Sequence, residues 1–555
     1  MNKNTRKKRI PIILLAIVLG VISTAFLINQ ESRDFKLGKS LDIFFSLVRE
    51  LNTFYVDEFD PEKLIRSAID GMLKTLDPYT TYYSESEINE LDLMTTGKYG
   101  GIGCVVRSNG EYAIVTEVYK GFPADVAGIK PGDLILQVDD QLLKSQPVEK
   151  VSEKLKGDPG TVVKVTIERN GIQTEFNMTR ERITLPPVPY YGMIDSKTGY
   201  IRFTNFTQNC NEDVRKALVS LEQYNPEGII LDLRSNPGGI MNEAVEVVNL
   251  FVDGGTEVVS TKGKVKQFDA VYKTKGKAVD EKIPLTVMIN KSSASASEIV
   301  AGAIQDLDRG VIVGQRSFGK GLVQITRPLS YNSSLKVTTA KYYIPSGRCI
   351  QAIDFAHRNE DGSVGYIPDS LIKTFKTRNG RPVKDGGGIT PDVETVPESL
   401  SLLASELYIK NYIFDFATKY YWSHPDIKSI DQISLTDDDY NDFITFLYNK
   451  GFNYQTYTEK SFSELVKNAQ REKYYDTNKE LFNLLQKEIT HDLKKDLMNF
   501  KNEITELLTA EIIKRYFYEE GAIQWSIKYD EEIKKAANIL ADKSLYKSIL
   551  QGKTN

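Results

Sequence analysis

The chain has 555 residues, which is enough for three or four domains. Its 71 Lys and Arg residues against 75 Asp and Glu residues leave a net charge of −4, so no basic excess indicates nucleic acid as a partner. The cysteines fit no metal-binding spacing and the histidines form no HExxH pattern, so we expect neither a metal nor a cofactor; these residues are Cys104, Cys210, Cys349, His357, His424 and His491.

Residues 1–30 have the pattern of a membrane anchor. An almost wholly apolar run from Ile10 to Ile28 is long enough to cross a bilayer as a helix, and it follows the basic residues Lys3, Arg6, Lys7, Lys8 and Arg9. Because basic flanks stay in the cytoplasm, we predict a single-pass membrane protein with its bulk outside, in the periplasm of a Gram-negative cell. A cleaved signal peptide is the alternative, although its apolar core is normally shorter and no clear Ala-x-Ala site follows.

Residues 31–97 are predicted to be a helical region. Apolar residues recur there at three- and four-residue steps in two segments, around Leu41–Val48 and Leu64–Leu73. A loop with Asp77, Pro78, Tyr79 and Thr80 follows the second segment, and we assign it no catalytic role.

Residues 98–183 change to the alternating pattern of strands. Gly101, Ile102 and Gly103 precede the first alternating run, and an Ala-Gly-Ile-Lys-Pro-Gly-Asp run occupies 127–133. This segment resembles a PDZ domain. The resemblance implies that the backbone N–H groups of the Gly101–Gly103 loop bind a peptide carboxylate, beside a strand edge that pairs with the peptide. A plain glycine turn without a ligand is the alternative.

Residues 184–395 begin with a proline-rich linker and then repeat strand, glycine turn and helix. The buried strand Gly228–Asp232 leads through Asn236-Pro237-Gly238-Gly239 into a helix, and the strand Leu285–Ile289 leads into the helix after Ser295. The repetition predicts an α/β core with helices packed on a sheet. Gly238 and Gly239 let the backbone approach a substrate, and their N–H groups are candidates for binding an oxyanion.

Two motifs in the core carry candidate chemistry. One is the stretch 293–298, Ser-Ala-Ser-Ala-Ser-Glu, and the other is the stretch 318–324, Phe-Gly-Lys-Gly-Leu-Val-Gln. A serine at a helix N-terminus meets partial positive charge and free N–H groups. A lysine in a dry site can lose its proton and act as a base. Leu322, Val323 and Phe318 are the apolar neighbours that we expect to bury Lys320.

Together the two motifs resemble the C-terminal processing peptidases, tail-specific serine proteases of peptidase family S41 that pair a PDZ domain with a Ser–Lys dyad. The resemblance covers about residues 40–395 and implies a crotonase/ClpP-like α/β core. By position in the motifs it makes Ser295 the nucleophile, Lys320 its base and Gln324 the residue that orients the lysine. It also implies protein or peptide substrates with apolar C-termini.

Each motif has a simpler alternative. Ser295 and Glu298 fit a capping box ahead of an apolar helix, which is compatible with catalysis. The spacing from Gly314 to Lys320 also matches a phosphate-binding loop. That interpretation is disfavoured because Gly321 replaces the magnesium-binding Ser or Thr and a strand-like run replaces the helix.

Residues 396–555 are polar, with aromatic residues at helical spacing. An interaction or dimerisation module, which would make the chain a homo-oligomer, and a helical buttress are equally compatible with this pattern. The whole sequence therefore predicts a multidomain α/β protein: a serine endopeptidase of the cell envelope. A non-enzymatic PDZ scaffold that binds C-terminal tails is the alternative, but a scaffold would need neither motif.

Overall fold

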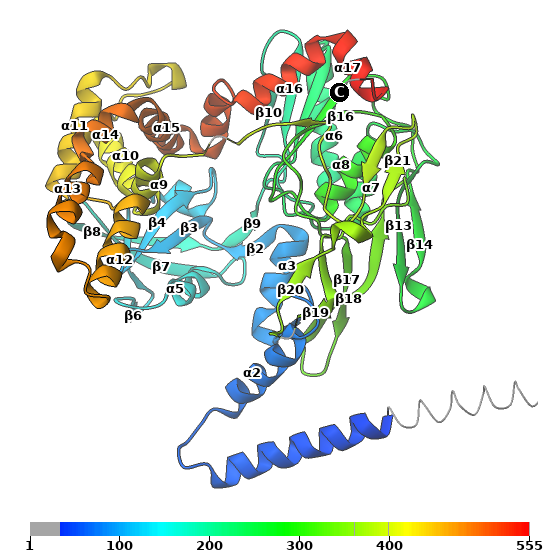
Figure 1. Cartoon of the computed structure of the whole chain (residues 1–555), viewed down its shortest axis with the longest axis horizontal. Coiled ribbons are helices and arrows are strands. Elements are labelled where there is room, and N and C mark those ends of the chain that lie inside the picture. The colour runs from blue at the N-terminus through cyan, green and yellow to red at the C-terminus, as the bar shows by residue number, and fades with distance from the viewer. Residues whose placement is uncertain (1–33, 360, 398, 554–555) are drawn as a thin grey trace, which may run out of the picture. The chain divides into compact units, whose positions relative to one another are not determined.

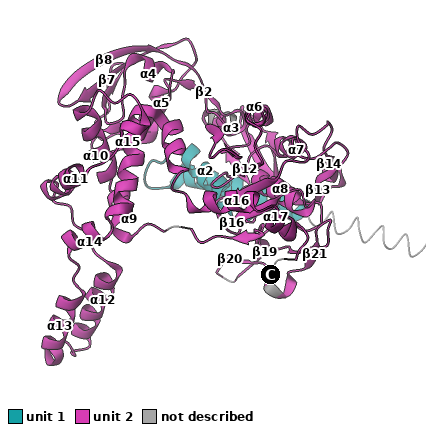
Figure 2. Cartoon of the chain, turned by 90° about the horizontal axis from the view of Figure 1, so that it is seen from above, with its two compact units in different colours: residues 1–78 teal, residues 79–555 magenta. Residues whose placement is uncertain are grey.

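The computed structural model describes residues 34–359, 361–397 and 399–553. The chain divides into two compact units, Met1–Pro78 and Tyr79–Asn555 (Figure 1, Figure 2). The predicted anchor at residues 1–30 lies outside the described residues. Across the described ranges, no helix combines the length and the apolarity that crossing a bilayer requires.

The first unit is helical, as predicted. Residues 34–54 form one helix, and α2 (Pro61–Lys74) follows it. The second helix begins where the Asp60 carboxylate accepts hydrogen bonds from the N–H groups of Glu62 and Lys63, with proline in the first helical position.

The second unit opens with a short strand that the helical pattern did not predict. This strand, β1 (Thr81–Tyr83), pairs antiparallel with β18 (Ser334–Tyr343) of the peptidase region. The helix α3 (Ile88–Thr96) comes next and ends at Gly97, whose φ of +67° suits glycine.

The PDZ region is an antiparallel sheet with two helices. Its strand order is β3-β4-β5-β7-β8, with β6 on β5 and a separate pair β2-β9. Alternate side chains such as Val115, Val163 and Val165 form its core with Val151 of the longer helix. The elements are β2 (Lys98–Gly101), β3 (Cys104–Ser108), β4 (Ala113–Val118), α4 (Pro123–Ala127), β5 (Leu134–Val138), β6 (Gln141–Leu142), α5 (Val148–Leu155), β7 (Val162–Arg169), β8 (Ile172–Thr179) and β9 (Glu181–Thr184).

The α/β core is a six-stranded sheet in the order β10-β11-β12-β15-β16-β23. All neighbouring pairs are parallel except β10 and β11, so the carboxyl ends of the five consecutive strands from β11 to β23 lie at one edge. The strands are β10 (Tyr190–Met193), β11 (Thr198–Arg202), β12 (Gly228–Asp232), β15 (Leu285–Ile289), β16 (Val311–Gly314) and β23 (Val393–Glu394).

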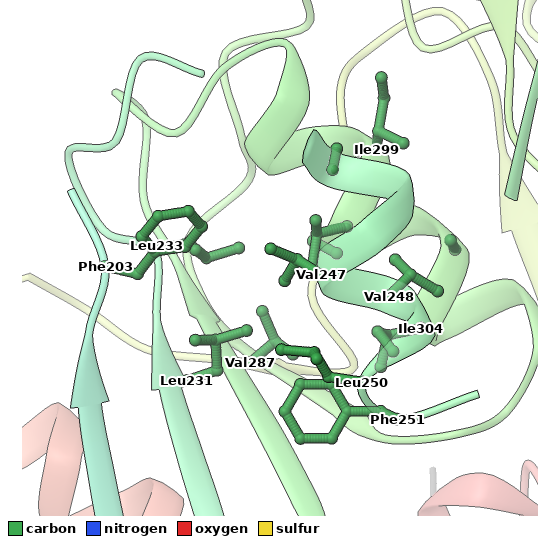
Figure 3. Close-up of a cluster of buried hydrophobic side chains, with 14 of the residues drawn as sticks. Phe203, Leu231, Leu233, Val247, Val248, Leu250, Phe251, Val287, Ile299 and Ile304 are labelled. Atoms are coloured by element: carbon green, nitrogen blue, oxygen red, sulfur yellow. The ribbon is translucent and has the colours of Figure 1, made fainter. Parts of the chain in front are cut away.

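Helices cover both faces of this sheet, because every central strand is apolar on both sides. Leu231 and Val287 point to the face that is packed by α6 (Cys210–Glu222), α7 (Met241–Asn249) and α8 (Ala296–Asp306) (Figure 3). Ile230 and Met288 point to the opposite face, where α16 (Glu531–Ala541) and α17 (Lys543–Leu550) cover them (Figure 1).

A second sheet carries the lysine motif. Its strand order is β1-β18-β13-β14, and β17 (Leu322–Pro328) pairs antiparallel with β18. The other two strands of this sheet are β13 (Glu257–Gly263) and β14 (Ala270–Lys273). Two further pairs form separate two-stranded sheets: β19 (Ile353–Arg358) with β20 (Val364–Tyr366), and β21 (Thr374–Lys376) with β22 (Pro382–Lys384).

The C-terminal region has two parts with different roles. The helices from α9 to α15 build a core of their own around Phe416, Phe443 and Leu508, whereas α16 and α17 belong to the peptidase core. For these last two helices the buttress interpretation is correct. The helices of the first part are α9 (Leu402–Ile409), α10 (Tyr412–Ser423), α11 (Asp437–Asn449), α12 (Tyr457–Arg471), α13 (Lys479–Ile489), α14 (Leu493–Asn499) and α15 (Lys501–Ser526).

Candidate active site

Ser295 lies where β15 gives way to α8, and its backbone is strained. Its φ of +55° and ψ of −113° lie outside the regions that residues with a side chain normally adopt. Strain of this kind costs on the order of 1–3 kcal/mol and persists only where surrounding contacts enforce it. Here the Ser295 N–H donates to Glu298 Oε2 at 2.8 Å, which is half of the predicted capping box.

The neighbouring serines are engaged in structural hydrogen bonds. The buried Ser293 hydroxyl donates to Leu233 O at 2.8 Å, and the buried Ser297 hydroxyl donates to Asn236 O at 2.9 Å. Ser295 is half-buried. Of the three serines in the motif, it is therefore the one whose side chain is both accessible and at the strained turn.

The glycine turn after β12 packs directly against Ser295. A Cβ atom at Gly238 would lie 2.6 Å from Ala294 O and 2.8 Å from both Ala296 N and Ser295 Cβ. Any larger residue would therefore fill the space in front of the Ala296 N–H group. Ala296 is the first residue of α8, and its N–H makes no hydrogen bond within the described chain.

The two predicted glycines differ in what their N–H groups can do. The Gly238 N–H donates to Asn236 Oδ1 at 2.9 Å and is therefore occupied. The Gly239 N–H has no acceptor among the described residues. The Asn236 carbonyl also accepts from Ala294 N at 3.0 Å, so this buried asparagine joins the glycine turn to the serine turn.

Lys320 is tied to the same helix through the Glu298 carboxylate. Its N–H donates to Glu298 Oε2 at 2.9 Å, and the Gly319 N–H donates to Oε1 at 2.7 Å. The Ser317 hydroxyl also donates to Oε1, at 2.5 Å. One carboxylate therefore binds the backbone of both predicted dyad residues, Ser295 and Lys320.

The Tyr342 hydroxyl is a second tie between the two motifs. It lies 3.2 Å from Ser295 O and also makes a close hydrogen bond to Lys320 O. The Tyr342 ring comes from β18, the partner strand of β17, and is buried. The two ties hold the backbone of Ser295 and the backbone of Lys320 to common side chains.

The Lys320 side chain is half-buried, and its Nζ lies 4.3 Å from the centroid of the Tyr79 ring. The face of an aromatic ring attracts an ammonium group. Of the predicted apolar neighbours, Leu322 is buried and Val323 is half-buried. The expectation for Phe318 is wrong, because this side chain is 45% exposed.

Gln324 lies on β17 after a bulge between Val323 and Gln324. Its amide nitrogen donates to Thr338 Oγ1 at 3.1 Å on the partner strand. Gln324 thus lies on β17, which begins two residues after Lys320. Its side-chain carbonyl oxygen remains a free acceptor within the described chain.

Glu298 is buried with four donors around it. Burial raises the pKa of its carboxyl from 4.5 to about 7, although the hydrogen bonds from Ser317, Lys320, Gly319 and Ser295 favour the charged form. A protonated carboxyl would have to give up part of this acceptor role. The contacts of Glu298 with the backbone of Ser295, Gly319 and Lys320 therefore favour its ionised form.

The histidines belong to other environments. The ring of His357 faces Asp354 and is 87% exposed, His424 stacks on Tyr420, and His491 faces Glu459 in the helical region. In the described chain no cluster of residues has the composition of a metal site. The phosphate-loop alternative fails, because strand β17 follows Lys320 where a helix is required.

Sequence reasoning missed two residues of the site. The sequence predicts a loop without a catalytic role at Tyr79 and gives no signal at Tyr342. Tyr79 meets the lysine side chain only where β1 pairs with the distant β18, and Tyr342 meets the lysine motif across the β17–β18 hairpin. The Ser-x-x-Glu spacing did identify Glu298, but only as a helix cap.

The PDZ region has a groove of about 390 Å³ between β3 and α5. Its walls include the predicted residues Ile102 and Gly103, together with Tyr99, Val148 and Leu155. In the described part of the chain β3 pairs only with β4, so its other edge is open. The carbonyl oxygens of Ile102 and Gly103 accept from Ala124 N and Tyr119 N.

A strained serine against a glycine turn, with a lysine tied to the same helix, is an arrangement of serine-type peptidases, here joined to a PDZ domain. Comparison with known families agrees with this class. Residues 197–357 match Peptidase family S41, residues 114–169 match the PDZ domain, and residues 403–540 match the C-terminal helical domain of probable PDZ-proteases.

Two relatives with similar sequences give the same result. The carboxy-terminal-processing protease of Bartonella bacilliformis is 37% identical over 372 residues, which cover 65% of this chain and 81% of that protein. A probable CtpA-like serine protease of Staphylococcus epidermidis is 32% identical over 414 residues, covering 73% and 81%. The structure of the photosystem II D1 C-terminal processing protease is 27% identical, with a TM-score of 0.35 and coverage of 65% and 93%. The chain belongs to peptidase family S41, among the C-terminal processing serine proteases.

The raised pKa of Glu298 predicts that stability falls and turnover rises as the pH increases. Because folding raises this pKa, the group's contribution to the free energy of unfolding is fully present below pH 4.5 and is lost as the pH rises through about 7. Turnover should rise over the same upper range as the carboxyl ionises. Glu298→Gln should remove the loss of stability and the part of the rise in turnover that is centred near pH 7, and lower kcat about 10- to 100-fold; a rise from deprotonation of Lys320 should remain. Stability and kcat measured from pH 5 to 9 check this, and unchanged slopes in the variant would show that Glu298 is not the titrating group.

Proposed function

We propose that this protein is an endopeptidase that cleaves protein substrates near their C-termini through a Ser295–Lys320 dyad. The observation that carries the proposal is the Glu298 carboxylate, which binds the backbone N–H groups of both residues. A protein that used these segments only for folding would not need a strained, accessible serine beside a lysine.

In the proposed reaction the neutral amine of Lys320 takes the proton of Ser295 Oγ, and Oγ attacks the carbonyl carbon of the peptide bond. The N–H groups of Ala296 and Gly239 donate to the oxyanion that forms. The intermediate collapses, the peptide C–N bond breaks, and Lys320 returns the proton to the leaving amine. Water, deprotonated by Lys320, then hydrolyses the acyl-enzyme and restores the Ser295 hydroxyl.

Two residues support the lysine in this proposal. The carbonyl oxygen of Gln324 orients the amine, while its amide nitrogen is anchored on Thr338. The Tyr79 ring fixes the direction in which the lysine side chain extends before substrate enters. Gly238 contributes space beside Ser295, not a donor, because its N–H is occupied.

The groove between β3 and α5 is proposed to capture substrate tails. An extended peptide would add to the open edge of β3, with its carboxylate at the N–H groups of the Gly101–Gly103 loop. The apolar wall formed by Ile102, Val148 and Leu155 favours an apolar last residue. The N-terminal segment is proposed to anchor the enzyme at the cell envelope with its catalytic part outside, and recovery of the protein in the membrane fraction tests this placement.

Ser295→Ala and Lys320→Ala should each lower kcat by about 10⁴-fold or more while the protein stays folded. Because the two residues act as one unit, the double variant should be no slower than either single variant. Turnover of an unstructured protein substrate, with circular dichroism to confirm folding, measures this. Ser293→Ala is the matched control, since its hydroxyl has a structural role.

Wild-type turnover in Ser295→Ala would exclude this residue as the nucleophile. A complete lack of hydrolysis in the wild-type protein, with intact binding of peptide tails, would favour the PDZ scaffold instead.

The PDZ groove should bind peptides that end in a free carboxylate and an apolar residue, and amidation of the terminus should weaken binding strongly. Titration calorimetry with acid and amide forms of one peptide measures the difference. Glu149→Ala on the rim of the groove is a control for non-specific charge effects. Equal affinities for both forms would mean that the loop does not bind the carboxylate.

A further inference from the structure

The glycine turn and the lysine motif both follow strands that end at the same edge of the core sheet. β12 ends at Asp232 and continues through Arg234 into the glycine turn, and β16 ends at Gly314 and continues through Gln315 into the lysine motif. The start of α16 contacts this edge through hydrogen bonds to Arg234 and Gln315. The helix belongs to the C-terminal region, far from both motifs in the sequence.

Glu532, the second residue of α16, contacts both continuations. Arg234 Nη1 donates to Glu532 Oε2 at 2.8 Å, and Gln315 Nε2 donates to Oε1 at 3.3 Å. The Thr395 hydroxyl, just after β23, also donates to Oε1. One carboxylate thus joins the segments after three strands of the sheet.

Arg234 is held on two further sides. Its Nη2 lies 2.7 Å from Asp232 Oδ2 and 2.8 Å from Asp530 Oδ2. Asp530 also accepts from Ile533 N at 2.9 Å and so caps α16. The Arg234 side chain is only 13% exposed, and removing one partner of such a buried pair is costly because the remaining charge stays buried.

We propose that Glu532 is a positioning residue for the Ser295–Lys320 site, acting through Arg234 and Gln315; this rests on the proposed function. Arg234 stands two residues before Asn236, whose carbonyl binds the backbone of Ala294 and the hydroxyl of Ser297. Gln315 stands just before the loop whose N–H groups bind Glu298. Glu532 therefore contacts the segment that leads into the Glu298-bound loop and, through Arg234, the segment whose Asn236 carbonyl binds the serine turn.

The attachment of α16 does not depend on this carboxylate. The helix is fastened to the sheet by its apolar face, where Ile533, Ala536, Ile539 and Leu540 are buried. A polar substitution at Glu532 should therefore leave the helix in place and change only the geometry of the sheet edge.

Glu532→Gln and Glu532→Ala are the test variants, and Glu531→Gln is the matched control. Glu531 is adjacent on the same helix, pairs with Lys534, and has a side chain that is 64% exposed. We expect kcat to fall about tenfold in Glu532→Gln and about 100-fold in Glu532→Ala, with KM changed less than about twofold. The control should keep wild-type values. Equal losses in Glu531→Gln and Glu532→Gln, or a change in KM alone, would contradict a positioning role.

Hydrogen exchange tests the same inference without catalysis. Peptides that cover residues 233–240 and 315–321 should exchange faster in Glu532→Gln than in Glu531→Gln, whereas peptides from the middle of α16 should exchange alike in both. Unchanged exchange in both segments would overturn the inference. If Ser295→Ala retains activity, the proposed function fails, and the exchange result still decides whether Glu532 fixes the sheet edge.

Discussion

The structure of the site depends on one buried carboxylate with four donors. Glu298 binds the N–H groups of Ser295, Gly319 and Lys320 and the hydroxyl of Ser317, so it joins a helix N-terminus to a loop that follows the next strand. Burying a charge is unfavourable unless hydrogen bonds compensate for it. The donors provide that compensation only when both segments are in place, so the contact selects one arrangement of the dyad.

The same contact explains how the strained turn at Ser295 is maintained. Glu298 binds the N–H of this residue, the Tyr342 hydroxyl binds its carbonyl oxygen, and Asn236 binds the preceding residue. Removing any one of these partners would leave a buried polar group unpaired while the strain remained. The strained turn is therefore held by several contacts together. Arg234 connects these contacts to Glu532 at the start of α16.

Much of this could be predicted from the sequence, because it has a local signature. Period-2 runs, glycine turns and apolar helices predicted the PDZ region and the α/β core, and the two motifs marked the segments whose backbones Glu298 joins. Tyr79, Tyr342 and Glu532 could not be predicted, since none stands in a motif; Tyr79 and Glu532 come from distant segments, and Tyr342 comes from the strand that pairs with β17. The sequence also did not predict that α16 and α17 separate from the other C-terminal helices. Their patterns are those of ordinary amphipathic helices, and only the sheet face that they cover distinguishes them.

The central claim is that the strained turn delivers Ser295 as the reacting nucleophile. A fluorophosphonate, which reacts covalently with activated serines, followed by mass spectrometry of the digested protein, tests this directly. We expect one adduct, on Ser295, which forms in the wild-type protein and is strongly slowed in Lys320→Ala. An adduct on Ser293 or Ser297, or labelling of Ser295 that does not change when Lys320 is removed, would contradict it.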